Sequence, residues 1–157
     1  GAIAVALDKI SGAEVTAVEI DETAFSYLET NVKENNSSVK PVMADALKIC
    51  DTFADGELDL IVSNPPYIKS ADIETLQKEV RLEPRLALDG GEDGGDFYRE
   101  IVSRWSRKLK KGGALAFELG EGQADAVKAL MTDKGFSDFK ISLDFGGVQR
   151  AIIGTLL

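Results

Sequence analysis

Short apolar strands alternate with amphipathic helices along this chain, and that alternation limits the folds open to it. The predicted strands cover residues 14–20, 39–43, 58–63 and 113–119. The predicted helices cover residues 21–32, 73–80, 96–110 and 123–133. Nearly continuous apolar strands separated by helices are typical of a parallel sheet covered on both faces. We therefore expect an α/β, doubly wound sheet.

Both ends of the chain depart from this alternation. Residues 139–145 and 150–156 have strand patterns, and Gly146-Gly147 between them favours a tight turn, so we expect an antiparallel strand pair at one edge of the sheet. Residues 1–10 have a helical pattern with no strand before them, whereas a doubly wound sheet usually opens with a strand and a glycine-rich turn. The sequence thus predicts a fragment that lacks the first strand and begins inside a glycine-rich loop. Exposed strand edges in such a fragment would favour self-association.

Composition narrows the class of function. The 157 residues, 44% of them hydrophobic, fit a single domain over residues 1–157. A net charge of −9 argues against nucleic-acid binding, and the lack of histidine argues against a zinc site, so we expect no metal. The single Cys50 allows no internal disulfide, and no apolar run is long enough to cross a membrane. These features predict a cytoplasmic protein that does not bind membranes.

Acidic side chains follow two of the predicted strands, where open α/β sheets bind their ligands. Glu19 ends the first strand pattern, and its carboxylate could accept hydrogen bonds from both hydroxyls of a ribose. The alternative for Glu19 is a solvated acid near a helix start. Asp45 follows the next strand, where its carboxylate could bind an adenine amino group while the Ala46 amide meets a ring nitrogen. The alternative for Asp45 is an ordinary turn former.

The strand over residues 58–63 runs into Asn64-Pro65-Pro66-Tyr67. Each proline restricts the residue before it and offers no N–H, so this backbone is stiff and presents acceptors. The Asn64 side-chain oxygen and the Pro65 carbonyl could accept both hydrogens of a planar NH2 group, with Tyr67 against its π face. Two such acceptors would restore lone-pair density to a delocalised nitrogen that attacks a sulfonium methyl. The alternative is a simple Pro-Pro turn.

Three motifs together resemble one family. They are NPPY at residues 64–67, RLEP at 81–84 and LDGGEDGG at 88–95. The chain is similar to the catalytic domain of the bacterial HemK-type release factor glutamine methyltransferases over nearly its whole length. NPPY alone also occurs in adenine-amino methyltransferases, and the other two motifs narrow the match.

The resemblance implies a Rossmann-like class I methyltransferase fold. It also implies an enzyme that transfers a methyl group from S-adenosylmethionine to the glutamine of the Gly-Gly-Gln loop in peptide chain release factors, with S-adenosylhomocysteine as the other product. It implies that residues 64–67 bind the glutamine, with Asn64, Pro65 and Tyr67 catalytic. The residues implied to contact the cofactor are Gly1, Glu19, Asp45, Ala46 and Asn64. Two alternatives stay open: an adenine-amino methyltransferase acting on DNA or RNA, and a non-catalytic fragment.

Several residues depart from the family pattern or carry weaker expectations. From the resemblance we expect that only Gly1 remains of the family's glycine-rich loop and that its N-terminal helical domain is missing. Gln149 stands where the family often has an acid. Arg81 and Glu83 could order a loop over the substrate or form an ordinary ion pair. Glu118 lies at a strand end near the expected site or caps the next helix.

The predicted helix over residues 96–110 is expected to pack through Ile101, Val102, Trp105 and Leu109. Its basic C-terminus is expected to end with Gly112 as the cap.

Overall fold

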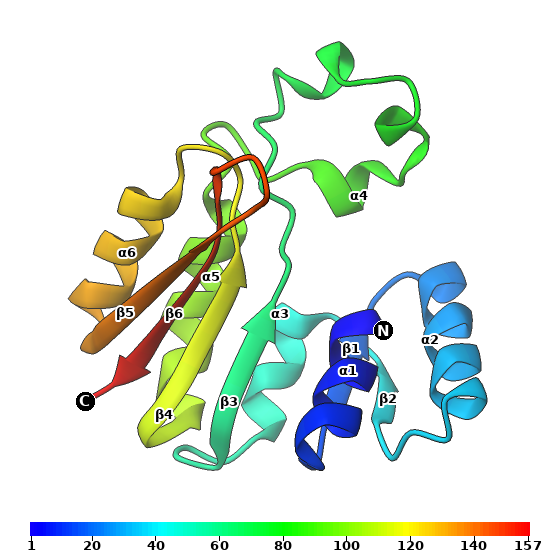
Figure 1. Cartoon of the computed structure of the whole chain (residues 1–157), viewed down its shortest axis with the longest axis vertical. Coiled ribbons are helices and arrows are strands. Elements are labelled where there is room, and N and C mark those ends of the chain that lie inside the picture. Colours follow the sequence, from blue (N-terminus) through cyan, green and yellow to red (C-terminus); the bar gives the residue numbers. More distant parts are fainter. The chain divides into compact units, whose positions relative to one another are not determined.

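The computed structural model describes residues 1–157, which form two compact units, Gly1–Thr52 and Phe53–Leu157 (Figure 1). Each unit has its own strands and helices. The single domain expected from the sequence stays a prediction. None of the helices combines the length and the apolar character needed to span a lipid bilayer.

The first unit is built on two parallel strands. Its elements are α1 (Ala2–Ser11), β1 (Thr16–Glu19), α2 (Glu22–Glu34), β2 (Lys40–Met43), α3 (Ala46–Ile49) and a 3-10 turn (Cys50–Thr52). β1 pairs with β2 so that Glu19 lies opposite Met43. Asp21 caps α2, as the sequence predicts, by accepting a 2.9 Å hydrogen bond from the Ala24 amide.

Asp8 connects α1 to the segment that enters β2. This buried carboxylate accepts hydrogen bonds from the Ser37 hydroxyl at 2.6 Å and from the Ser38 amide at 3.1 Å, and the Ser38 hydroxyl also donates to it. These donors, with the Ser37 hydroxyl first, lower the pKa of Asp8 to about 2. The ionised carboxylate is therefore the form that the fold stabilises.

The second unit is a four-stranded mixed sheet in the order β3-β4-β6-β5. Its strands are β3 (Leu58–Ser63), β4 (Leu109–Glu118), β5 (Phe136–Leu143) and β6 (Gln149–Leu156). Its helices are α4 (Arg85–Leu88), α5 (Asp96–Trp105) and α6 (Ala124–Asp133), with 3-10 turns at Ile73–Thr75, Val80–Leu82 and Ser106–Lys108. β3 and β4 are parallel, whereas β6 is antiparallel to both β4 and β5. The α/β fold with an antiparallel C-terminal pair is confirmed.

The core of this unit lies between one face of the sheet and helices α5 and α6. Leu115 and Phe117 of β4 are fully buried, and Tyr98 of α5 meets Phe117 edge to face, with ring centroids 5.2 Å apart. Burying each such apolar side chain contributes about 2 kcal/mol. The predicted packed face is confirmed for Ile101, Val102 and Trp105 of α5, which are buried, whereas the buried Leu109 belongs to β4. Helices on the opposite face of the sheet stay a prediction.

Two helix predictions are wrong. Residues 73–80 form 3-10 turns and irregular chain, because Ile73 is buried while most of its neighbours are exposed and no apolar face packs. The helix over 96–110 ends at Trp105, and the chain enters β4 at Leu109, where sheet pairing with Leu58 replaces helical hydrogen bonds. Gly112 therefore lies inside β4, with φ of 78°, and is not a helix cap.

The low pKa of Asp8 predicts an acid-dependent contribution to stability. Because the folded pKa lies below the unfolded one, the stabilisation is complete above the unfolded pKa and is lost as the pH falls through about 2. Asp8→Asn should lower the melting temperature at pH 6, and the difference from wild type should shrink as the pH approaches 2. Thermal unfolding followed by circular dichroism measures this. The exposed control Asp72→Asn should show no such convergence, and a constant Asp8→Asn deficit across the pH range would contradict the account.

Candidate functional site

The segment that follows β3 forms the centre of the site. Ser63 lies opposite Phe117 in the parallel pair β3–β4, so Asn64 and Glu118 leave the sheet at the same edge. The Asn64 side chain is exposed and Pro65 is buried. No donor of the chain occupies the Asn64 side-chain oxygen or the Pro65 carbonyl. The two acceptors that the sequence identifies are thus both without a hydrogen-bond donor from the chain.

Tyr67 is held from two sides. Its hydroxyl donates a 3.3 Å hydrogen bond to Glu118 Oε1, and its ring lies so close to Gly120 that a Cβ there would be 2.9 Å from Cδ2. Partial burial first, and then the Glu118 carboxylate, raise the pKa of Tyr67, so the hydroxyl stays protonated and donates. Glu118 therefore orients the tyrosine and does not cap the next helix. Its carbonyl accepts a 2.9 Å hydrogen bond from the buried Tyr98 hydroxyl.

The glycine-rich motif packs its backbone directly on the NPPY segment. Two backbone hydrogen bonds of Ile68 join the segments. The Ile68 amide donates to Leu88 O at 3.0 Å, and the Ile68 carbonyl accepts from the Gly90 amide at 2.8 Å. A Cβ at Gly90 would lie 2.7 Å from Tyr67 Cα, and one at Gly94 would lie 2.4 Å from Tyr67 O. Only glycine permits this approach, which explains the motif physically.

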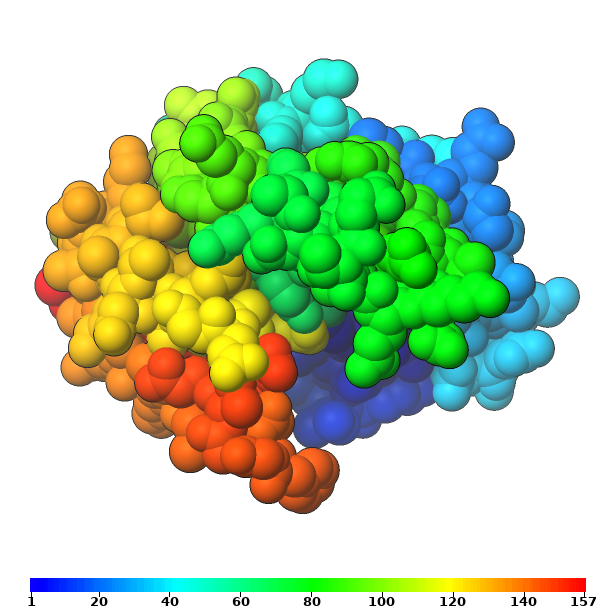
Figure 2. Space-filling view, turned by 90° about the horizontal axis from the view of Figure 1, so that it is seen from above, coloured from blue at the N-terminus to red at the C-terminus, as the bar shows by residue number.

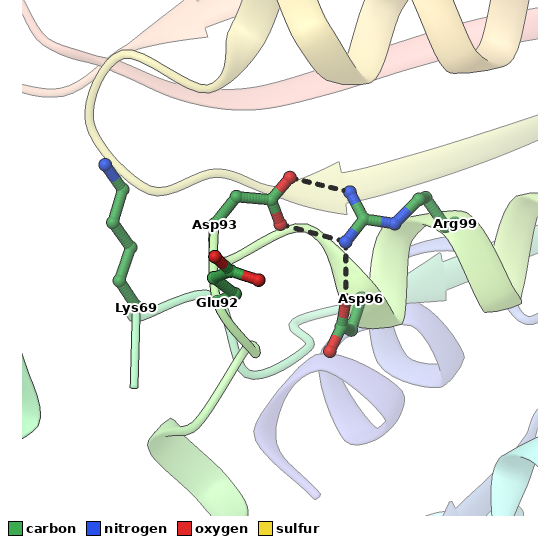
Figure 3. Close-up of a pocket in the computed structure, with 5 residues that line it drawn as sticks. All are labelled: Lys69, Glu92, Asp93, Asp96 and Arg99. Carbon is green, nitrogen blue, oxygen red and sulfur yellow. Dashed lines mark hydrogen bonds and ion pairs between the residues drawn. The ribbon is translucent and has the colours of Figure 1, made fainter. Parts of the chain in front are cut away.

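Charged side chains fix the turns of the glycine-rich motif. Asp89 accepts from the Gly91 amide at 3.1 Å and also binds the Ser70 hydroxyl and Arg85. Figure 3 shows an open hollow lined by Lys69, Glu92, Asp93, Asp96 and Arg99, in which Arg99 bridges Asp93 and Asp96. The Arg99 guanidinium, with the Gly95 amide, lowers the pKa of Asp93 to about 2. Arg99, Asp93 and Asp96 thus pair with one another in the turn that leads into α5.

Sequence reasoning missed Gln123, whose side chain hydrogen-bonds four groups around the site. It follows β4 in the stretch Gly120-Glu-Gly-Gln123 and is the N-cap residue of α6. A polar residue directly after Gly122, placed where a strand turns into a helix, is the available signal. The yellow segment that holds it lies beside the green loop that follows Tyr67 in Figure 2.

Of the predicted cofactor residues, Glu19 ends β1 and Asp45 follows β2 in the first unit, whereas Asn64 lies in the second unit. Glu19 Oε1 accepts from the amides of Ile20 and Asp21 at 2.8 and 3.0 Å, so the carboxylate is held at the strand end by the backbone. Asp45 Oδ1 caps α3 by accepting a 2.9 Å hydrogen bond from the Leu47 amide, and its role toward a ligand stays a prediction.

Two other predicted residues also have defined surroundings. Gly1 is the N-cap residue of α1, and a Cβ there would lie 2.5 Å from Leu28 Cδ1, the movable end of that side chain. Ala46 is the first residue of α3.

Arg81 and Glu83 are exposed and form no ion pair with each other, so that alternative is wrong. With Ile73, Arg85 and Leu88 they line an open hollow in the loop between β3 and α5. Gln149 is exposed at the start of β6, and the adjacent Arg150 pairs with Asp144 at 2.9 Å.

Gly94→Ala should destabilise the protein more than a control that carries only backbone strain. Gly112 has nearly the same φ, 78° against 79° for Gly94, but open space where a Cβ would lie. Gly112→Ala should cost about 1–2 kcal/mol for its left-handed backbone, and Gly94→Ala about 1–3 kcal/mol more for the clash with Tyr67 O. Urea unfolding measures both. Equal losses would contradict the close contact.

Comparisons with known proteins agree with this architecture. Residues 1–92 match the family model of the methyltransferase small domain. The chain is 42% identical over 158 residues to the release factor glutamine methyltransferase of Geobacter sulfurreducens, covering 99% of this chain and 55% of that protein. The corresponding enzyme of Thermodesulfovibrio yellowstonii is 34% identical over 155 residues, covering 98% and 55%. The chain thus spans about half the length of these curated relatives.

Solved structures show the same fold. A methyltransferase from Pyrococcus furiosus superposes with a TM-score of 0.73 at 25% identity, covering 98% of this chain and 68% of that one. The hMettl16 catalytic domain, in complex with MAT2A 3'UTR hairpin 1, superposes with a TM-score of 0.71 at 17% identity, covering 98% and 59%. Because the family model matches 92 of 157 residues, this chain, with its class I methyltransferase fold, belongs to the methyltransferase small domain family.

Proposed function

We propose that this protein transfers a methyl group from S-adenosylmethionine to the side-chain amide of the glutamine in the Gly-Gly-Gln loop of peptide chain release factors. One observation carries the proposal: the NPPY segment leaves β3 with both acceptors free while Tyr67 is fixed beside them. Sequence identity of 42% to a release factor glutamine methyltransferase supports this substrate.

The proposed chemistry depends on hydrogen-bond acceptors and not on a general base. Asn64 Oδ1 and Pro65 O accept the two N–H groups of the glutamine amide, and Tyr67 lies against its flat face. An amide nitrogen is a poor nucleophile because its lone pair is delocalised into the carbonyl. The acceptors bind the nitrogen best when positive charge develops on it, so they stabilise the transition state more than the ground state.

Glu19, Asp45, Ala46 and Gly1 are the residues proposed to bind the cofactor, with Asn64 bordering it. When bound, S-adenosylmethionine supplies an electrophilic methyl group on a sulfonium. The chain fits such a group at Glu19, because backbone amides hold Oε1 and leave Oε2 as an acceptor for ribose hydroxyls. Asp45 Oδ1 accepts the helix-cap hydrogen bond, and Oδ2 lies 3.2 Å from Nζ of the exposed Lys48. Adenine binding by Asp45 would therefore depend on Oδ2.

An adenine-amino methyltransferase is the alternative enzyme, since an aromatic NH2 presents the same two hydrogens. The net charge of −9 disfavours it, because binding to nucleic acid depends on clustered Lys and Arg. The hMettl16 complex with an RNA hairpin is only 17% identical and supports the shared fold, not a shared substrate. A non-catalytic protein is the other alternative, and titration with the cofactor distinguishes it from both enzymes.

The test uses the protein as its gene encodes it, incubated with S-adenosylmethionine, a release factor and an adenine-rich oligonucleotide. We expect one methyl group on the release factor, mapped by mass spectrometry to the Gly-Gly-Gln glutamine. Asn64→Ala should lower kcat about 100-fold or more, as loss of one preorganised hydrogen-bonding group does in other enzymes. The control Asn31→Ala, on the exposed face of α2, should match wild type.

Three results would each contradict the proposal. Methyl transfer to the oligonucleotide alone would favour the adenine enzyme. Absence of cofactor binding would favour the non-catalytic alternative. An Asn64→Ala variant with unchanged kcat would show that the amide is held by other groups.

A further inference from the structure

The side chain of Gln123 uses both ends of its amide on groups around the NPPY segment. Its Nε2 donates to Tyr67 O at 3.0 Å and to Gly94 O at 3.3 Å. Its Oε1 accepts from the Gly120 amide at 3.0 Å and shares the single proton of the Tyr98 hydroxyl, 3.2 Å away, with the Glu118 carbonyl. One partly buried side chain therefore joins the loop after β3, the glycine-rich motif, the end of β4 and helix α5.

Through Tyr67, the position of Gln123 affects where the two acceptors, Asn64 Oδ1 and Pro65 O, can lie. Tyr67 lies only three residues after Asn64, and the prolines between them remove most of the freedom of the intervening backbone. Fixing the Tyr67 carbonyl therefore limits where Asn64 Oδ1 and Pro65 O can lie. Tyr98 is itself buried, and its hydroxyl also binds the Glu118 carbonyl at 2.9 Å, so this partner of Gln123 is held in place.

Few side chains could replace this amide. The position requires two donated and two accepted hydrogen bonds at one planar group, which glutamine and asparagine provide. Asparagine is one methylene shorter and would not span from α6 to Tyr67. A glutamate would keep the acceptor toward Gly120 and Tyr98 but would turn a second carboxylate oxygen toward two carbonyl oxygens, where donors are needed.

We infer that Gln123 is a positioning residue: it holds the NPPY backbone in the geometry that methyl transfer requires, without touching the reacting atoms. The inference rests on the proposed function for its kinetic consequence. Its structural part, that Gln123 restrains residues 64–70 and 88–96, stands independently of which substrate is methylated.

Two variants and one control test it in the protein as its gene encodes it. Gln123→Met keeps the length and removes all four hydrogen bonds, whereas Gln123→Glu removes only the donors. Ala126→Glu adds the same charge on the exposed side of α6 and serves as the control. Amide hydrogen exchange is measured for peptides over 64–70 and 88–96, and methyl transfer is measured at saturating and limiting release factor.

We expect both Gln123 variants to raise exchange in these peptides and to lower kcat about 10- to 100-fold, as small misplacements of reacting groups do. The cofactor dissociation constant should stay close to wild type. The glutamate variant should regain activity relative to wild type as the pH falls, because a protonated carboxyl again donates to Tyr67 O. The methionine variant should not regain activity, and Ala126→Glu should behave as wild type.

The outcomes separate this inference from the proposed function. If the protein methylates the oligonucleotide and not the release factor, the proposed function is wrong, and a fall in kcat on that substrate still supports the inference. If neither substrate is methylated, exchange alone decides, and unchanged exchange overturns the inference. Raised exchange with unchanged kcat also overturns it, because the restraint would then have no catalytic consequence.

Discussion

The close contact between the NPPY backbone and the glycine-rich motif determines the geometry of the candidate site. Gly90 and Gly94 approach Tyr67 so closely that any side chain at either position would collide with its backbone. This contact fixes a loop that would otherwise leave the sheet with little restraint, since Asn64 is exposed and has no partner in the chain. Gln123 and Glu118 then hold the Tyr67 carbonyl and hydroxyl. The acceptors proposed to bind the substrate are thus positioned by groups that do not contact the substrate.

Such a site suits a reaction that needs orientation more than acid–base chemistry. The chain has no histidine, and its acceptors are neutral oxygens whose charge does not change near neutral pH. Neutral acceptors on a stiff backbone require little reorganisation when charge develops on a bound nitrogen. Partial burial and the Glu118 carboxylate raise the pKa of Tyr67. Its hydroxyl therefore stays protonated and remains a donor to Glu118.

The sequence predicts the strands and the residues of the NPPY segment because both depend on local patterns. Nearly continuous apolar runs between helical patterns predict β3 and β4, and the two prolines mark Asn64 as unusual. The helix expected over 73–80 does not form, because its periodicity finds no surface to pack against. Gln123 was missed because its partners, Tyr67 and Gly94, are distant in sequence and only the tertiary fold brings them together. Asp45 was ambiguous for a similar reason, since one short motif can cap a helix or bind a ligand.

In the proposed reaction, Asn64 and Pro65 hold the substrate amide by its two hydrogens. A crystal structure of the protein with S-adenosylhomocysteine and a Gly-Gly-Gln peptide tests this most directly. We expect the glutamine nitrogen within hydrogen-bond distance of both Asn64 Oδ1 and Pro65 O, with the Tyr67 ring against the face of the amide. A glutamine side chain bound elsewhere, or Asn64 turned away to bond the protein backbone, would contradict it.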